Sequence, residues 1–182
     1  GPPQNYDLIS AMSFGLLTAL GLRQHHSLLD IGCGSLRNGR LLIPYLNRER
    51  YGGIEPNRWL VEEGIARELG ASLIEIKGPR FHFAASAEGL DLDDHFDFAL
   101  AQSIFSHTGR DLLEHWLHSI IRLLKPSGAL IATYFLGDSE PSETGWIYPG
   151  GVRFPEATMA ACARQQGFRF RPLDWRHPSQ RW

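Results

Sequence analysis

The sequence predicts an α/β fold in which a mostly parallel β-sheet lies between two layers of helices. Short apolar runs of strand length alternate along the chain with segments whose apolar residues recur at helical spacing. Such alternation is typical of a parallel sheet covered on both faces. The chain has 182 residues, of which 43% are hydrophobic, enough for one substantial core and too few for two ordinary domains. We therefore expect a single domain over residues 1–182.

The first elements are a helix and a strand that ends in glycine. A leading amphipathic helix is expected over residues 5–20, with Asn5 as its N-cap. Residues 27–31 are a short apolar run that meets the glycine turn, residues 32–34, as a buried parallel strand does at its end. A helix should follow and should end or kink near Pro44.

A second β-α unit follows. Residues 50–54 predict a strand, and Asn57 is expected to cap the next helix. The residues of that helix that should face inward are Val61, Ile65 and Leu69. For the third strand the sequence leaves two candidates, the apolar stretch 73–76 and the aromatic segment 81–83.

The next unit is clearer. Residues 96–101 predict a strand, and a helix follows whose start is marked by a capping box of Thr108 and Asp111. Its apolar face consists of Leu113, Trp116, Leu117, Ile120 and Leu124. Residues 126–128 should stop this helix, and residues 129–135 predict a further buried strand.

The C-terminal part begins with a loop. Residues 137–151 are rich in Gly, Pro, Ser and acidic side chains, which indicates a lid or a substrate-binding insertion. A last helix is expected over residues 155–165, and Gly167 should end it. Residues 168–173 predict a strand, and residues 179–182 could begin another.

Composition disfavours several classes of partner. The formal net charge of -2 lacks the basic excess that binds phosphate backbones, and no apolar run approaches the length of a membrane span. Cys33 and Cys162 are far apart and in dissimilar contexts, which argues against disulfides and favours a reducing cytoplasm. His115 and His118 have no evident third ligand, so no metal site is predicted.

The glycine turn carries the strongest functional signal, because glycine lets the backbone pass close to a ligand. A dinucleotide fingerprint that starts at Gly32 needs a third glycine at position 37, where this chain has Arg37. Asp30, just before the turn, suits a ligand with an ammonium group better than one with a pyrophosphate. Both observations disfavour a nicotinamide-dependent oxidoreductase.

Residues 30–34 (DIGCG) resemble motif I of the class I S-adenosylmethionine-dependent methyltransferases, and residues 51–57 (YGGIEPN) resemble the second motif. Residues 96–103 resemble the fourth motif, and residues 123–130 (LLKPSGAL) resemble the helix-to-strand signature LKPGG. The resemblance extends from about residue 27 to residue 135. It departs from the family where Leu36 replaces the third glycine of motif I and where Ser127 precedes Gly128.

The resemblance implies S-adenosyl-L-methionine as cofactor and a Rossmann-like three-layer sandwich of about seven strands, the last one antiparallel. Residues 1–24 would be a leading helix, 25–136 the cofactor-binding core, and 137–182 a substrate-side loop with C-terminal strands. The turn would contact the methionine part, Glu55 would hold both ribose hydroxyls, and Ser86 with Ala87 would read the adenine. The implied cofactor-binding residues are Asp30, Gly32, Cys33, Gly34, Ser35, Glu55, Pro56, Asn57, Ser86, Ala87, Gln102 and Ser103.

His107 is the best candidate for a catalytic base, since it follows the fourth strand at the edge where open α/β sheets bind ligands. Histidine side chains suit proton removal near neutral pH. The alternative is that His107 only caps the next helix or contacts the cofactor. The candidate substrate-contacting residues are Tyr134, Trp146, Tyr148 and Trp175, with the alternative that they are core residues, as aromatic side chains more often are. Arg37 and Arg40 are candidates for the cofactor carboxylate, or solvated surface residues.

Three functions follow, and the first is methyl transfer to a small-molecule acceptor, for which a hydroxyl of a sugar or another metabolite is expected. The absence of an Asn/Asp-Pro-Pro-aromatic motif at residues 101–104 (AQSI) favours it over methylation of planar amino groups. The alternatives are a non-catalytic cofactor-binding partner subunit and the NAD-dependent oxidoreductase. We expect a small-molecule partner, no nucleic acid and no membrane, with a homodimer as the oligomer to test.

Overall fold

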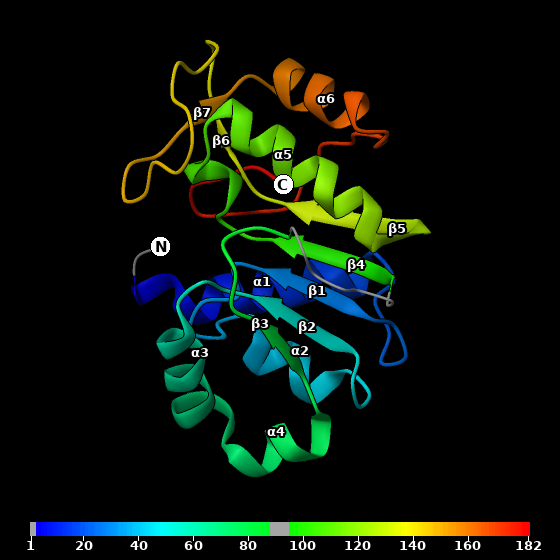
Figure 1. Cartoon of the computed structure of the whole chain (residues 1–182). Coiled ribbons are helices and arrows are strands. Elements are labelled where there is room, and N and C mark those ends of the chain that lie inside the picture. Colours follow the sequence, from blue (N-terminus) through cyan, green and yellow to red (C-terminus); the bar gives the residue numbers. More distant parts are fainter. Residues whose placement is uncertain (1–2, 88–94) are drawn as a thin grey trace.

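The computed structural model describes residues 3–87 and 95–182, and its centre is a parallel sheet of five strands in the order β3-β2-β1-β4-β5 (Figure 1). The strands are β1 (Leu28–Ile31), β2 (Tyr51–Ile54), β3 (Arg80–His82), β4 (Phe96–Ala101) and β5 (Leu124–Ala132). Every pairing in this sheet is parallel. The α/β architecture is confirmed, but in the described residues the sheet has fewer strands than the seven expected and lacks the antiparallel one.

Helices alternate with these strands. They are α1 (Tyr6–Ala19), α2 (Gly39–Tyr45), α3 (Arg58–Gly64), α4 (Ala71–Lys77), α5 (Arg110–Leu123) and α6 (Glu156–Gln165). The shorter turns are η1 (Pro3–Asn5), the π-helical η2 (Ile65–Leu69) and η3 (Phe105–His107). A small separate pair of strands, β6 (Phe135–Leu136) and β7 (Arg153–Phe154), was not expected from the sequence.

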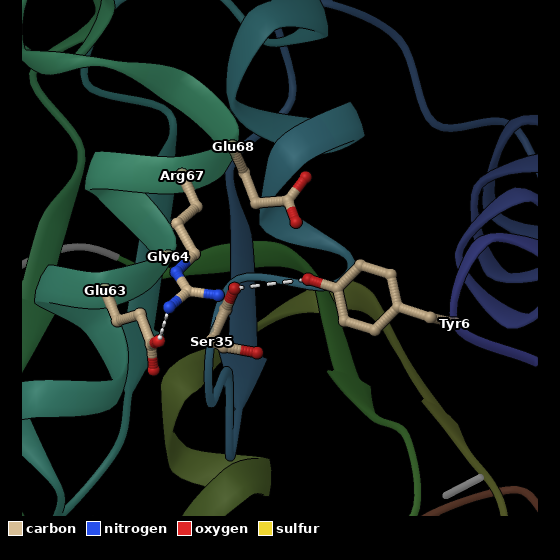
Figure 2. Close-up of a pocket in the computed structure, with 6 residues that line it drawn as sticks. All are labelled: Tyr6, Ser35, Glu63, Gly64, Arg67 and Glu68. Atoms are coloured by element: carbon tan, nitrogen blue, oxygen red, sulfur yellow. Dashed lines mark hydrogen bonds and ion pairs between the residues drawn. The ribbon is translucent and has the colours of Figure 1, made fainter. Parts of the chain in front are cut away.

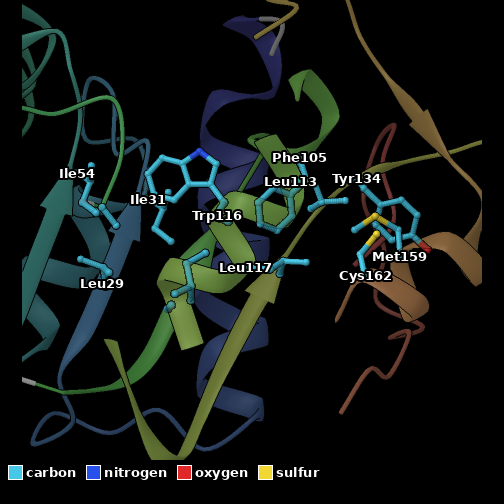
Figure 3. Close-up of a cluster of buried hydrophobic side chains, with 14 of the residues drawn as sticks. Leu29, Ile31, Ile54, Phe105, Leu113, Trp116, Leu117, Tyr134, Met159 and Cys162 are labelled. Carbon is cyan, nitrogen blue, oxygen red and sulfur yellow. The ribbon is translucent and has the colours of Figure 1, made fainter. Parts of the chain in front are cut away.

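The residues of β1 alternate between two hydrophobic clusters, one on each face of the sheet. Leu28 packs in a cluster with α1 and α2, whereas Leu29 and Ile31 pack in a cluster with α5 and α6. Figure 3 shows the second cluster, with Trp116 of α5 beside the strands and Met159 of α6 farther out. Because both faces of β1 are buried, its sequence is almost wholly apolar.

Of the two candidates for the third strand, residues 81–83 largely coincide with β3, whereas residues 73–76 form no strand, and the strand expected at residues 168–173 is also absent. Residues 73–76 lie in α4, between Gly70 with φ of 80° and Gly78 with φ of 58°. Glycine in a left-handed conformation commonly ends a helix, and a short apolar run alone does not distinguish a helix from a strand. Residues 168–173 form no strand; Phe168 and Phe170 pack against the core while the backbone stays outside the sheet.

Several helix and strand ends also differ from prediction. Asn5 and Asn57 occupy N-cap positions but make no side-chain capping bond. The capping box is wrong, because Gly109 is the N-cap of α5 and the Thr108 hydroxyl donates to the Phe105 carbonyl instead. Helix α5 ends at Leu123 and β5 begins at Leu124, so residues 126–128 lie within the strand, which ends at Ala132 rather than at residue 135.

The strand order reverses between β1 and β4. In open α/β sheets, ligands bind at such a switch point, outside the carboxyl ends of the strands. Here those ends are the glycine turn after β1 and residues 102–104 after β4. None of the helices in the described part of the chain is both long and apolar enough to cross a bilayer.

Candidate cofactor and acceptor site

The glycine turn is held at the end of β2. The backbone N–H groups of Gly32 and Cys33 both donate to the Ile54 carbonyl, at 2.8 and 3.1 Å. Gly32 and Gly34 have φ of 67° and 53°, a region that favours glycine. A Cβ on Gly32 would lie 2.2 Å from Cδ1 of Ile104 on the loop after β4, so the two sides of the switch point approach closely.

Leu36 occupies the place of the family's third glycine and retains a glycine-like backbone. Its φ is 62°, and its side chain is fully buried beside Cys33 and Val61. A bulky residue in this region carries strain, which burial of the leucine side chain offsets. Burial also raises the pKa of the Cys33 thiol, so Cys33 serves as a packing residue rather than a nucleophile.

Glu55 links the turn to the tip of β2, in the position that the resemblance implies for the ribose-binding acid. Its Oε2 accepts from the Gly34 N–H at 3.2 Å, and its Oε1 accepts from both the backbone and the side-chain amide of Asn57 at 2.9 and 3.0 Å. A carboxylate has about four acceptor positions. Glu55 is thus buried and oriented, with acceptor capacity left for hydroxyl groups.

Asp30 lies beneath the turn. Its side chain is 1% exposed and accepts a hydrogen bond of 2.8 Å from the Tyr51 hydroxyl. Burial raises the pKa of Asp30 to about 7, against smaller opposing effects of Tyr51 and Arg37. Asp30 is therefore a buried residue beneath the turn, where it can act on a ligand through its electric field more than through direct contact.

The expected adenine-side residues follow β2 and β3. Pro56 and Asn57 are exposed beyond Glu55, and Ser86 is half-buried in the loop after β3. Ala87 packs in the core cluster that also contains Ile54. The structure thus places these residues on neighbouring strand ends, beside the turn.

The other side of the switch point is polar. Gln102 is buried, and its side-chain amide donates to the Ser103 hydroxyl at 2.6 Å. Ser103 has φ of 60°, and its N–H donates to the Thr133 hydroxyl at 2.7 Å. The Gln180 amide also donates to the Ser103 hydroxyl, at 2.8 Å. Sequence reasoning missed Gln180, because no local pattern connects positions 77 residues apart.

His107 ends η3 and lies beneath loop 137–151. Its Nδ1 is 2.5 Å from the Gly150 carbonyl oxygen, and its ring meets that of Tyr148 edge-on at 5.4 Å. Because a carbonyl only accepts, Nδ1 carries the proton in this contact and Nε2 is left as an acceptor. The loop is tied down by hydrogen bonds from the Ile147 N–H to the His107 carbonyl and from the Val152 N–H to the Ser106 carbonyl.

The four aromatic candidates do not form one pocket. Tyr148 is 77% exposed beside His107, and Trp146 pairs with Thr108 in an isolated bridge. Tyr134 is buried at the end of β5, and Trp175 packs on α1, where its indole donates to the Met12 carbonyl. Only Tyr148 of this set contacts His107 among the described residues.

A cavity of about 280 Å³ lies between the start of α1, the turn and α3, lined by Tyr6, Ser35, Glu63, Gly64, Arg67 and Glu68 (Figure 2). The Tyr6 hydroxyl donates to the Ser35 carbonyl at 3.3 Å, and Arg67 pairs with Glu63 at 2.8 Å. The helix approaches closely, because a Cβ on Gly64 would lie 2.5 Å from the Ser35 carbonyl oxygen. Within the described residues, no group of three His, Cys, Asp or Glu side chains could hold a metal ion.

Solved structures with a similar fold include two methyltransferases and a cyclase. Magnesium protoporphyrin IX methyltransferase (ChlM) from Synechocystis PCC 6803, with bound S-adenosylmethionine, has a TM-score of 0.67 and 18% identity over 98% of this chain and 76% of its own. The mitomycin 7-O-methyltransferase MmcR has a TM-score of 0.71 and 19% identity over 96% and 52%. The cyclase SpnF has a TM-score of 0.67 and 20% identity over 92% and 60%.

The sequence itself matches a family. Residues 29–130 match the methyltransferase domain family, which is more than half of the chain. The matched part runs from β1 to β5 and includes the turn, Glu55 and the polar end of β4. The chain therefore belongs to the methyltransferase domain family, and it is an enzyme with the Rossmann-like fold of the class I S-adenosylmethionine-dependent methyltransferases.

Proposed function

We propose that this protein transfers the methyl group of S-adenosylmethionine to a hydroxyl group of a small molecule, with His107 as the base. The observation that carries the proposal is the contact of His107 Nδ1 with the Gly150 carbonyl. It holds the imidazole in the tautomer whose Nε2 can accept a proton. Two of the similar structures are methyltransferases of small molecules, one a porphyrin and the other a mitomycin oxygen.

The residues of the site fit the cofactor. S-adenosylmethionine supplies a methyl group on a positively charged sulfur. The glycine turn allows close approach, and the buried Glu55 retains acceptor capacity for the ribose hydroxyls. Loop 137–151 is hydrogen-bonded to His107, and Tyr148 places an exposed aromatic ring beside the imidazole.

His107 has one chemical task in this proposal. Its Nε2 takes the proton of the acceptor hydroxyl, while Nδ1 keeps its own proton, donates it in a hydrogen bond to the Gly150 carbonyl and so fixes the ring. Positioning and proton removal are the main contributions that a protein makes to such a displacement. A small acceptor is favoured, because the chain lacks a basic surface excess.

The test compares two variants. Release of S-adenosylhomocysteine is measured against a panel of sugars, phenols and other hydroxylated metabolites, together with calorimetric affinity for the cofactor. His107→Ala should lower turnover by about 10²–10⁴-fold with unchanged cofactor affinity and should lose the acidic limb of the pH profile, where protonation of the base stops the reaction. Glu55→Ala should instead weaken cofactor binding. A His107→Ala enzyme with normal turnover and a normal pH profile would reject the base.

A further inference from the structure

The C-terminal segment, residues 175–182, crosses the carboxyl ends of β4 and β5 (Figure 1, red). At one end, the Trp175 indole donates to the Met12 carbonyl of α1 at 3.2 Å. At the other, Arg181 and Tyr134 exchange two backbone hydrogen bonds of 2.8 and 3.0 Å, and Trp182 is buried in the core. The segment is thus fixed on both sides of the ligand-binding edge.

Between these anchors lies His177, with one nitrogen satisfied and one unpartnered. Its Nδ1 accepts from the backbone N–H groups of Ser179 and Gln180, at 3.2 and 2.9 Å. The ring therefore carries its proton on Nε2, which is buried and has no partner among the described residues. Burial, together with the nearby charge of Arg37, lowers the pKa of His177 to about 4, so the ring is neutral at pH 7.

Gln180 is oriented in a complementary way. Its Nε2 donates to Ser103, which leaves its Oε1 as a buried acceptor without a partner in the described structure. Buried polar atoms normally have hydrogen-bond partners, and an orphaned pair in one segment calls for an explanation. Here the orphaned donor and the orphaned acceptor lie within four residues of each other.

Arg37 adds charge at the same place. It is half-buried just after the glycine turn, close enough to interact electrostatically with both His177 and Asp30. An α-amino-acid group has a carboxylate, which needs donors, and an ammonium, which needs acceptors. Arg37 and His177 are donors, and Gln180 Oε1 is an acceptor.

We propose that the C-terminal segment closes over the amino-acid end of S-adenosylmethionine, with His177 Nε2 and Arg37 binding the carboxylate and Gln180 Oε1 accepting from the ammonium. The proposal rests on the cofactor named above. It assigns cofactor recognition to residues beyond residue 130, where the match to the methyltransferase family ends.

The test separates the amino-acid end from the rest of the ligand. The full chain is titrated calorimetrically with S-adenosylhomocysteine and with 5′-methylthioadenosine, which has the same adenosine and sulfur but no amino-acid group. His177→Ala and Gln180→Leu should each weaken binding of the first ligand by about 10-fold or more and change binding of the second less than about twofold. Control variants are His25→Ala and Gln165→Ala, both at exposed positions away from the segment.

Conservative changes distinguish contact from mere structural support. His177→Gln keeps an N–H donor and should bind S-adenosylhomocysteine more tightly than His177→Ala. Gln180→Glu keeps the acceptor and should bind it more tightly than Gln180→Leu. Equal losses for both ligands, or no loss for either, would overturn the proposal. No methyl acceptor enters these titrations, so a failure of the hydroxyl-acceptor proposal is seen separately, as absent turnover with an intact binding pattern.

Discussion

At the scale of single residues, Asp30 couples the site to protonation. Its carboxyl group is buried under the turn, and its pKa is raised to about 7, compared with about 3.9 in an unfolded chain. Between about pH 4 and pH 7 the folded protein therefore holds a proton that the unfolded chain releases. The free energy of unfolding contributed by Asp30 should fall as pH rises through this window and should level off above it.

Asp30→Asn should remove this dependence while preserving an acceptor for the Tyr51 hydroxyl. Relative to wild type, the variant should gain stability on the order of 3 kcal/mol between pH 4.5 and pH 8. The measurement is urea unfolding at both pH values, with Asp138→Asn, at an exposed position, as the control. A stability difference that stays constant with pH would show that Asp30 is ionised in the folded protein.

Backbone positions were predictable where a motif fixes them. The glycine turn follows β1 and Glu55 follows β2, as the sequence predicts, and Leu36 has a φ of 62°, in the region that favours glycine. The placement of Gln180 was not predictable, because it depends on a contact with Ser103 that only the folded chain brings about, and His177 is placed through its bond to the Gln180 N–H. The packing of Trp175 on α1 was not predictable either, because it also joins distant parts of the sequence.

At the scale of elements, loop 137–151 is pinned to the start of α5. The Asp111 carboxylate accepts from the Gly145 N–H at 2.9 Å, and the Gly109 N–H donates to the Gly145 carbonyl at 2.8 Å. The contact is so close that a Cβ on Gly109 would lie 2.3 Å from the backbone oxygen of Glu143. Asp111, expected to complete a capping box, thus anchors the loop instead.

Gly109→Ala should displace this loop without straining its own backbone, since Gly109 has φ of -66°. Amide exchange at residues 143–147 should rise by about 10-fold or more as local hydrogen bonds are lost, while affinity for S-adenosylhomocysteine stays within twofold. Gly15→Ala is the matched control, because its Cβ would meet only an ordinary contact of 3.5 Å. Unchanged exchange in the loop would mean that its anchorage does not depend on this approach.

Elements with a strong local pattern were predicted well, and those that depend on the edge of the sheet were not. Helix α5 has an apolar face at helical spacing, and strands β1, β2 and β4 are short segments followed closely by turn residues, which together favour their assignment. Residues 168–173 alternate apolar and basic side chains as a strand would, but their backbone does not pair with β5. Whether a segment pairs at the edge of a sheet depends on the whole sheet. A stretch of six residues does not contain that information.

At the scale of the whole molecule, the switch between β1 and β4 gathers segments from both ends of the chain. The turn, the end of β4 and the C-terminal segment meet there through Ser103 and Gln180. Trp116 of α5 packs on one face of the sheet, in a different hydrophobic cluster from Trp182. Ligand binding should therefore change the environment of Trp182 in the C-terminal segment and leave that of Trp116 nearly unchanged.

NMR of the tryptophan indole N–H groups tests this coupling. Trp182 packs edge-on against His177 at 5.7 Å, so its indole signal should shift when S-adenosylhomocysteine binds. Trp116 should shift far less, because it is buried in the hydrophobic cluster on the other face of the sheet, separate from the cluster that contains Trp182. Single Trp→Phe variants assign the signals. If the amide of Gly34 responds to the ligand while the Trp182 indole does not, the C-terminal segment lies outside the cofactor site, and the two ends of the chain meet for stability alone.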